Sequence, residues 1–241
     1  MMTPVIDAEA VKEFLDKAEP FLTSDMLHHW DVTLLARQQK LTEILFKPSL
    51  NSNARIKSLS ALVASTARLS EDALIPWMPV MQRVLDLTID DVQAVVPYIG
   101  GLDSAPSWLW EWATFWGFTI DPVQHPWWSR WLYSPDSRTG SMALVMMDPE
   151  QLSSTADELY QQLSMGVTFY VSVLESTRRF NVVSDRFRGW IGLACTYAVY
   201  MFTMASWRLT TEFTQVMPPF PKVVQSLLGI HRWEGSVFAK G

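Results

Sequence analysis

Three aspartates stand close together in the segment LDLTIDDV, at positions 86, 90 and 91. If a helix begins before Leu85, Asp86 and Asp90 share one helical face, because side chains four residues apart on a helix are neighbours. Acidic side chains arranged in this way hold magnesium ions that bind diphosphates. A helix that begins after Thr88 would instead have Asp90 and Asp91 as acids of its first turn, where negative charge is favourable.

Glu111 lies among Trp108, Trp110 and Trp112. It is either a buried carboxylate with a raised pKa or a polar residue at the edge of an apolar stripe. A cavity lined by these aromatic rings would stabilise cations at their faces. With Asp86, Asp90 or Glu111 at its mouth, such a cavity predicts an enzyme or a binding protein for an apolar, isoprenoid-like small molecule, which is the second of two functions considered for this sequence.

No motif for a metal or cofactor stands out in the chain. The four histidines lack the spacing that places two metal ligands on one helical face. The chain has no glycine-rich phosphate loop, no GxSxG and no CxxC. The sequence therefore predicts no metal and no cofactor, and it leaves open whether the protein is an enzyme.

Four arginines fall within eleven residues of the segment RRFNVVSDRFR, namely Arg178, Arg179, Arg186 and Arg188. Arginine is the side chain best suited to bidentate contact with phosphate, so one interpretation is a phosphate or nucleic-acid site. The other is a solvated helix end whose arginines pair with acidic residues. The net charge of −6 argues against free, non-specific binding of nucleic acid. It is compatible with a groove inside an assembly whose outer faces are acidic.

Seven of the twelve tryptophans lie between residues 108 and 133. Such density is typical of a core, of an apolar ligand cavity or of a surface that another protein covers. Because seven tryptophans exceed what a single core usually takes from so short a segment, we expect an interface. The residues predicted to form it are Trp108, Trp112, Trp116, Trp127, Trp128 and Trp131.

Composition and charge favour a protein that associates with other chains. Only 18% of the residues are charged, against roughly 25% in an ordinary globular protein. Acidic residues dominate 71–160, whereas basic residues dominate 161–241. Two faces of opposite charge fit head-to-tail contacts between copies. The first predicted function is therefore a non-enzymatic helical subunit of a larger assembly, a homo-oligomer or a complex with another protein. A coat or nucleocapsid protein is one version, with nucleic acid held only inside the assembly.

The elements that must position these residues are helices almost throughout, so the predicted class is all-α. Apolar residues at helical spacing predict a central helix over 185–213, apolar nearly all round. Residues 118–141 are expected to form a long loop rich in tryptophan and proline, and a proline-punctuated arm ends the chain. The stretch 167–174 is β-branched enough to be a strand. We expect one domain over 1–241, with a possible subdivision into 1–140 and 141–241.

The chain shows no sign of secretion or membrane insertion. Its one cysteine, Cys195, forms no internal disulfide, and acidic residues interrupt the first twenty positions. Residues 189–207 carry no charge and reach the length of a spanning helix, but their mean hydropathy is modest. The sequence therefore predicts a cytoplasmic protein in which this segment is a buried helix.

Overall fold

The computed structural model describes residues 4–46, 52–208, 217–236 and 238–239. These residues form helices, turns and loops, and no β-strand occurs among them. The all-α class predicted from the sequence is confirmed. In chain order the helices are α1 (Ala8–Ala18), η1 (Glu19–Phe21), α2 (Ser24–Leu45), α3 (Ser52–Ser60), α4 (Glu71–Leu74), η2 (Ile75–Trp77), α5 (Met78–Asp90), η3 (Val92–Ala94), α6 (Val95–Gly100), α7 (Ser107–Ile120), α8 (Ser141–Val145), η4 (Pro149–Gln151), α9 (Ala156–Ser176), α10 (Asp185–Arg208), α12 (Phe220–Leu227) and α13 (Ile230–Glu234).

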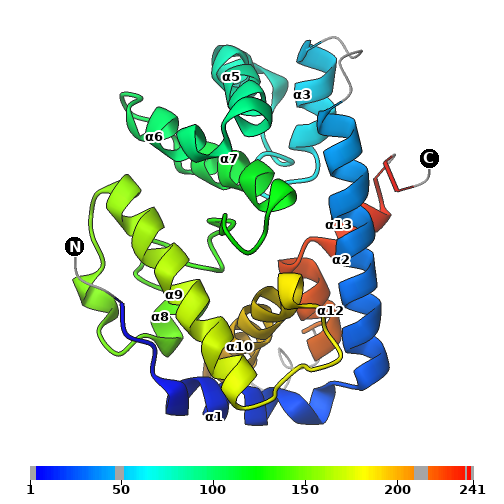
Figure 1. Ribbon diagram of the computed structural model, residues 1–241, viewed down its shortest axis with the longest axis vertical. Coiled ribbons are helices and arrows are strands. Elements are labelled where there is room, and N and C mark those ends of the chain that lie inside the picture. The colour runs from blue at the N-terminus through cyan, green and yellow to red at the C-terminus, as the bar shows by residue number, and fades with distance from the viewer. Residues whose placement is uncertain (1–3, 47–51, 209–216, 237, 240–241) are drawn as a thin grey trace.

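Two groups of helices are connected by the long helix α2. Figure 1 shows α2 along one side of the molecule, with α3, α5, α6 and α7 towards one end and α1, α8, α9 and α10 towards the other. Helix α10 packs against α1, α2, α8, α9 and α12, and α7 packs against α2, α5 and α6. The contacts of α1 with α10 and of α2 with α13 join parts of the chain on either side of residue 140. Residues 209–213, the last of the predicted helix 185–213, lie outside the described residues.

Side-chain caps fix the beginnings of the first two long helices. Asp7 precedes α1, and its Oδ1 accepts hydrogen bonds from the backbone N–H groups of Glu9 and Ala10, both at 3.0 Å. Thr23 precedes α2, and its hydroxyl accepts from the N–H of Met26 at 3.2 Å. Each cap satisfies amide groups that have no partner within the helix.

Of the two helix starts considered for this segment, the one before Leu85 is confirmed and the one at Thr88 is wrong. Helix α5 begins ten residues earlier at Met78, with Pro79 in its first turn, and continues to Asp90. The Thr88 hydroxyl donates to the carbonyl of Val84 at 2.7 Å, as it does inside a helix. Proline is favourable in a first turn because its missing N–H would be unpaired there anyway. Asp90 is consequently the last residue of a helix and not an acid of a first turn.

The stretch 167–174 is helical, so its interpretation as a strand is wrong as well. It lies inside α9, which continues through Gly166. A Cβ atom at Gly166 would lie 2.5 Å from the terminal methyl of Met142 and 3.0 Å from that of Met146. The missing side chain therefore lets α8 approach α9 closely. The modest helix penalty of β-branched residues, a few tenths of a kcal/mol each, is outweighed by this packing.

Two buried arginines bind the carboxyl ends of helices. The Arg37 Nη1 atom donates to the carbonyl of Leu228 at 2.7 Å, and its guanidinium lies 5.7 Å from the centroid of the Phe115 ring. Burial lowers the pKa of Arg37 to about 10. Arg55 donates to the carbonyls of Ile44 and Leu45, at the end of α2. Cations are favourable there because the helix dipole leaves partial negative charge on the last carbonyls.

No helix in the described parts of the chain has both the length and the apolar character needed to cross a membrane. The uncharged segment 189–207 lies within α10. Its side chains from Trp190 to Thr196 are buried against the neighbouring helices.

Candidate functional site

The tryptophan-rich segment is buried inside its own chain. All side chains of α7 from Leu109 to Thr119 are buried. Of the six tryptophans predicted to form an interface, five are at most 9% exposed and only Trp108 is half-buried. The five buried ones are Trp112, Trp116, Trp127, Trp128 and Trp131. Because other residues of the same chain already cover them, these five side chains are core residues and offer little surface to a partner.

Several of the aromatic side chains hold an internal loop in place. Residues 121–140 connect α7 to α8. The carbonyls of Trp131 and Leu132 accept from N–H groups at the start of α8, and other loop carbonyls accept from tryptophan side chains. The indole N–H of Trp190 donates to the backbone carbonyl of Pro122 at 3.0 Å, and that of Trp128 donates to the backbone carbonyl of Tyr133 at 3.1 Å. The Trp127 indole donates to the carbonyl of Glu111 in α7, also at 3.1 Å. Tryptophan is suited to this position because it fills apolar space and carries one donor for a buried carbonyl.

A cavity of about 440 Å³ opens beside this aromatic core. Its lining side chains come from the turn after α3, from α7, from the internal loop and from α10. They are Ala64, Ser65, Arg68, Ser107, Trp108, Glu111, Arg130, Trp131 and Tyr197, and we call this space the Glu111 cavity. An adjoining cavity of about 210 Å³ shares Ser107, Glu111 and Arg130 with it and adds Trp110, Trp128 and Tyr133. Glu111 and Arg130 therefore line both cavities.

Glu111 is a buried carboxyl group, as one of the two sequence interpretations predicted. Glu111 is 7% exposed, and burial raises the pKa of its carboxyl group. The Ser65 hydroxyl and the charges of Arg130 and Arg232 act in the opposite direction and favour the carboxylate. Within the described residues no cation lies close enough to form an ion pair with Glu111. The carboxyl group is thus available to a bound molecule.

Polar groups on the wall of the Glu111 cavity differ in burial. The indole N–H of Trp131 is buried and has no hydrogen-bond partner among the described residues. Arg68 and Arg130 are exposed, and Trp108 and Tyr197 are half-buried. The cavity therefore offers a buried carboxyl group, aromatic faces beside it and two cations at the solvent side.

The aspartates predicted to bind a metal lie elsewhere. Asp86 and Asp90 are on the same helix, but Asp86 accepts a hydrogen bond from Gln82 at 2.8 Å, and Asp90 and Asp91 are exposed. None of the three lines the Glu111 cavity. In the described part of the chain, no group of three or more histidine, cysteine, aspartate or glutamate side chains is placed to hold a metal ion. The structure thus brings Glu111, and not the aspartates, to an aromatic cavity.

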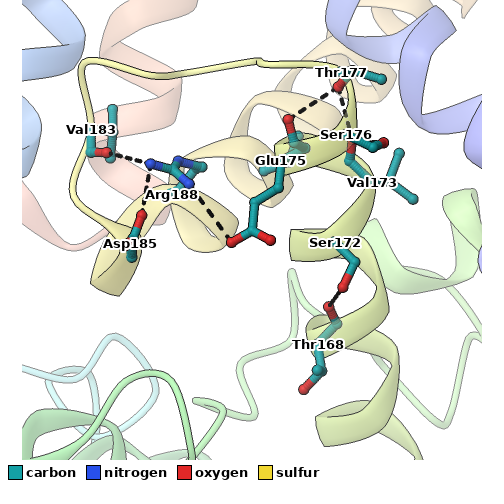
Figure 2. A network of polar contacts seen from close by, with 10 residues as sticks. Thr168, Ser172, Val173, Glu175, Ser176, Thr177, Val183, Asp185 and Arg188 are labelled. Atoms are coloured by element: carbon teal, nitrogen blue, oxygen red, sulfur yellow. Dashed lines mark hydrogen bonds and ion pairs between the residues drawn. The ribbon is translucent and has the colours of Figure 1, made fainter.

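Three of the four clustered arginines have partners elsewhere in the chain, so the four do not form a single phosphate site. Arg188 donates to Asp185 at 2.7 Å and to the carbonyl of Val183 at 3.2 Å, and it lies 3.8 Å from Glu175 (Figure 2). These contacts connect the end of α9 to the start of α10.

The other three arginines differ in their partners. Arg179 forms ion pairs with Asp16 and with Glu19, the latter at 2.9 Å. Arg186 donates to the side-chain oxygen of Gln38 at 3.0 Å. Arg178 is exposed and forms no ion pair with any described residue. The geometry agrees with the interpretation in which clustered arginines pair with the protein itself.

Sequence reasoning singled out Glu111 and Trp108 as cavity residues but missed Arg68, Arg130 and Tyr197. These three are isolated residues in separate parts of the chain, and no local pattern connects them to Glu111. Only the packing of α7 against the internal loop and α10 brings the set together. Comparison of the chain with protein-family models, with curated proteins and with solved structures finds no match.

Proposed function

We propose that the protein binds a small molecule with a flat apolar body and an anionic group in the Glu111 cavity. The observation that carries this proposal is that one cavity combines aromatic walls, a buried carboxyl group and exposed guanidinium groups. Its volume of about 440 Å³ lies in the range of small-molecule sites. Such sites are mostly apolar, with a few polar groups that orient the ligand.

The charges at the solvent side define which molecules fit. Arg68 and Arg130 are exposed at the cavity, so an anionic group can contact them and remain hydrated. Trp108 and Tyr197 are half-buried beside them, so an apolar ring can cover their exposed faces. A fully apolar, isoprenoid-like ligand would leave the Glu111 carboxyl and the two guanidinium groups without a partner on the ligand. The site therefore favours an amphipathic ligand.

A fluorescence titration with 1-anilinonaphthalene-8-sulfonate, an aromatic anion, tests the proposal. We expect saturable binding to the folded protein, weakened roughly two- to fivefold by Arg130→Ala, because a partly solvated contact between opposite charges contributes up to about 1 kcal/mol. Arg83→Ala removes the same charge from an exposed position on α5 that does not line the cavity, and it should leave the affinity unchanged. Equal affinities in the two variants would contradict binding in the Glu111 cavity.

A second candidate function is the assembly subunit, with a surface different from the one that the tryptophans suggested. The observation that favours it is a group of exposed apolar side chains near the amino terminus, since Val5 is 56%, Met147 62% and Phe169 43% exposed. The carbonyl of Val5 accepts from the N–H of Met147 at 3.0 Å, and Val5 and Phe169 line one surface groove. Neighbouring exposed apolar residues are typical of contact surfaces. The partner proposed here is a second copy of the chain.

Light scattering after size-exclusion chromatography tests this second candidate. We expect an oligomer that Phe169→Asp dissociates, whereas Ile75→Asp, at an exposed apolar position outside the groove, leaves it intact. A monomer at high protein concentration would contradict the assembly. A coat-like assembly would also retain nucleic acid, which raises the ratio of absorbance at 260 nm to that at 280 nm.

A further inference from the structure

The groups that line the Glu111 cavity are arranged by charge from the interior to the surface. The buried group is the Glu111 carboxyl, which accepts hydrogen bonds when it is ionised. The exposed groups are the guanidinium groups of Arg68 and Arg130. A ligand that satisfies all of them has hydrogen-bond donors at its inner edge, a flat middle and a negative charge at its outer end.

The inner edge of the ligand can be specified further. An ionised carboxylate accepts two parallel hydrogen bonds through its two oxygens. Among the common nucleobases only guanine presents two adjacent N–H donors on its Watson–Crick edge, at N1 and at the 2-amino group. Adenine and cytosine have one amino donor beside an acceptor nitrogen, and uracil has one N–H between two carbonyls.

The remaining groups fit the rest of a nucleotide. Aromatic side chains stack on nucleobases, and arginine guanidinium groups bind phosphate through paired N–H donors. Trp108 and Tyr197 supply half-buried aromatic faces at the cavity, and Arg68 and Arg130 supply the cations. We infer that the Glu111 cavity binds a guanine nucleotide, with the Glu111 carboxylate on N1–H and the 2-amino group and the phosphate at Arg68 and Arg130. This inference rests on the proposed function and names the ligand class for the same cavity.

Isothermal titration calorimetry at pH 7.5 with GMP, IMP and AMP tests the inference. IMP lacks only the 2-amino group, so it isolates the second hydrogen bond to Glu111. We expect GMP to bind at least about fivefold more tightly than IMP or AMP, because a bidentate contact to a base discriminates by roughly 1–3 kcal/mol. In Glu111→Gln the amide offers one acceptor and one donor, so the preference for GMP over IMP should disappear. Glu150→Gln, at an exposed position outside the cavity, should retain it.

A surface variant provides a second measurement that does not alter the core. Arg130 is exposed, so Arg130→Ala is expected to fold. It should weaken GMP binding several-fold and leave the affinity for guanosine, which has no phosphate, unchanged. Equal losses for GMP and guanosine would contradict a phosphate contact at Arg130.

Two sources of the nucleotide can be distinguished with short RNA. If the natural ligand is a free nucleotide, GMP should bind as tightly as the single-stranded pentamer UUGUU. If it is a guanine within RNA, UUGUU should bind at least tenfold more tightly than GMP, and UUUUU should bind weakly. Equal binding of GMP, IMP and AMP, together with displacement of 1-anilinonaphthalene-8-sulfonate, would overturn the guanine inference and leave the proposed function intact. Failure of both the nucleotides and the aromatic anion to bind would overturn both.

Discussion

Asp31 in α2 holds the start of α10 through a single residue, Ser184. The Oδ1 atom of Asp31 accepts the Ser184 hydroxyl at 2.6 Å, and Oδ2 accepts the Ser184 backbone N–H at 3.0 Å. Asp31 is only 5% exposed. The carbonyl of Ser184 in turn accepts from the N–H groups of Phe187 and Arg188, in the first turn of the helix. A buried carboxylate far away in sequence thus positions the residue at which α10 begins.

Replacing Asp31 by alanine should destabilise the fold. The change leaves the Ser184 N–H and hydroxyl without their partner in a half-buried position, and hydrogen bonds to a charged group each contribute about 1.5–3 kcal/mol. Because Ser184 is only half-buried, water replaces part of the two lost contacts, and we expect the free energy of unfolding in urea to fall by about 2–3 kcal/mol, less than the sum of the two bonds. Asp25→Ala removes an exposed acid from the first turn of the same helix and should cost less than about 1 kcal/mol. Equal losses in the two variants would contradict the role of Asp31.

Two buried tryptophans in the aromatic core provide a matched comparison. The indole N–H of Trp127 donates to the carbonyl of Glu111, whereas that of Trp112 has no partner among the described residues. Replacement by phenylalanine removes similar volume at both positions but a hydrogen bond only at Trp127. We therefore expect Trp127→Phe to lower the free energy of unfolding by about 1–3 kcal/mol more than Trp112→Phe, as chemical denaturation would measure. A larger loss at Trp112 would show that volume, and not the indole donor, determines the stability of the loop.

The arginine cluster should contribute to stability through Arg188. Arg188→Met keeps most of the apolar stem but loses the contacts to Asp185, Glu175 and the Val183 carbonyl shown in Figure 2. Because the acidic partners remain solvated, we expect a loss of about 1 kcal/mol in the free energy of unfolding, smaller at high salt. Arg178→Met changes an exposed side chain without an ion pair and should alter stability by less than about 0.5 kcal/mol. A larger loss of stability for Arg178→Met than for Arg188→Met would indicate that Arg188 is not the connection between α9 and α10.

Glu111 should make stability depend on pH in a defined direction. Burial raises the pKa of Glu111 in the folded state above its unfolded value of 4.5. The folded state therefore binds more protons between these two pKa values, and the contribution of Glu111 to stability falls as pH rises through that interval. Each pH unit within the interval changes this contribution by about 1.4 kcal/mol.

The measurement compares wild type with Glu111→Gln by urea unfolding at pH 4, 6 and 8. Glutamine stays neutral, so the stability of the variant relative to wild type should increase from pH 4 upwards and become constant above the folded-state pKa. Glu150→Gln, an exposed change, should show a nearly constant difference across the series. A difference for Glu111→Gln that does not change with pH would contradict a raised pKa.

Local features of the sequence were sufficient to predict some elements and insufficient for others. Asp7 is an acid directly before a helix, a capping signal that needs only the residues next to it, and the structure shows the expected hydrogen bonds. Thr88 has the same kind of local signal, yet it lies inside α5 because Pro79 begins that helix earlier and the buried face continues past Thr88. A capping residue therefore indicates a helix start only where no earlier start includes it.

The tryptophan-rich segment shows most clearly what the sequence determined and what only tertiary structure decided. Amino-acid type and spacing determined that the chain is helical, and that a dense group of aromatic side chains follows Ser107. They could not tell whether another protein or the chain itself covers that group, because burial depends on segments far away in sequence. Packing of the internal loop against α10 placed five of the six predicted interface tryptophans in the core and brought Arg68, Arg130 and Tyr197 to Glu111. Residues so widely separated become one site only when the chain folds, because hydrophobic burial is non-directional and leaves no local pattern for the side chains that it brings together.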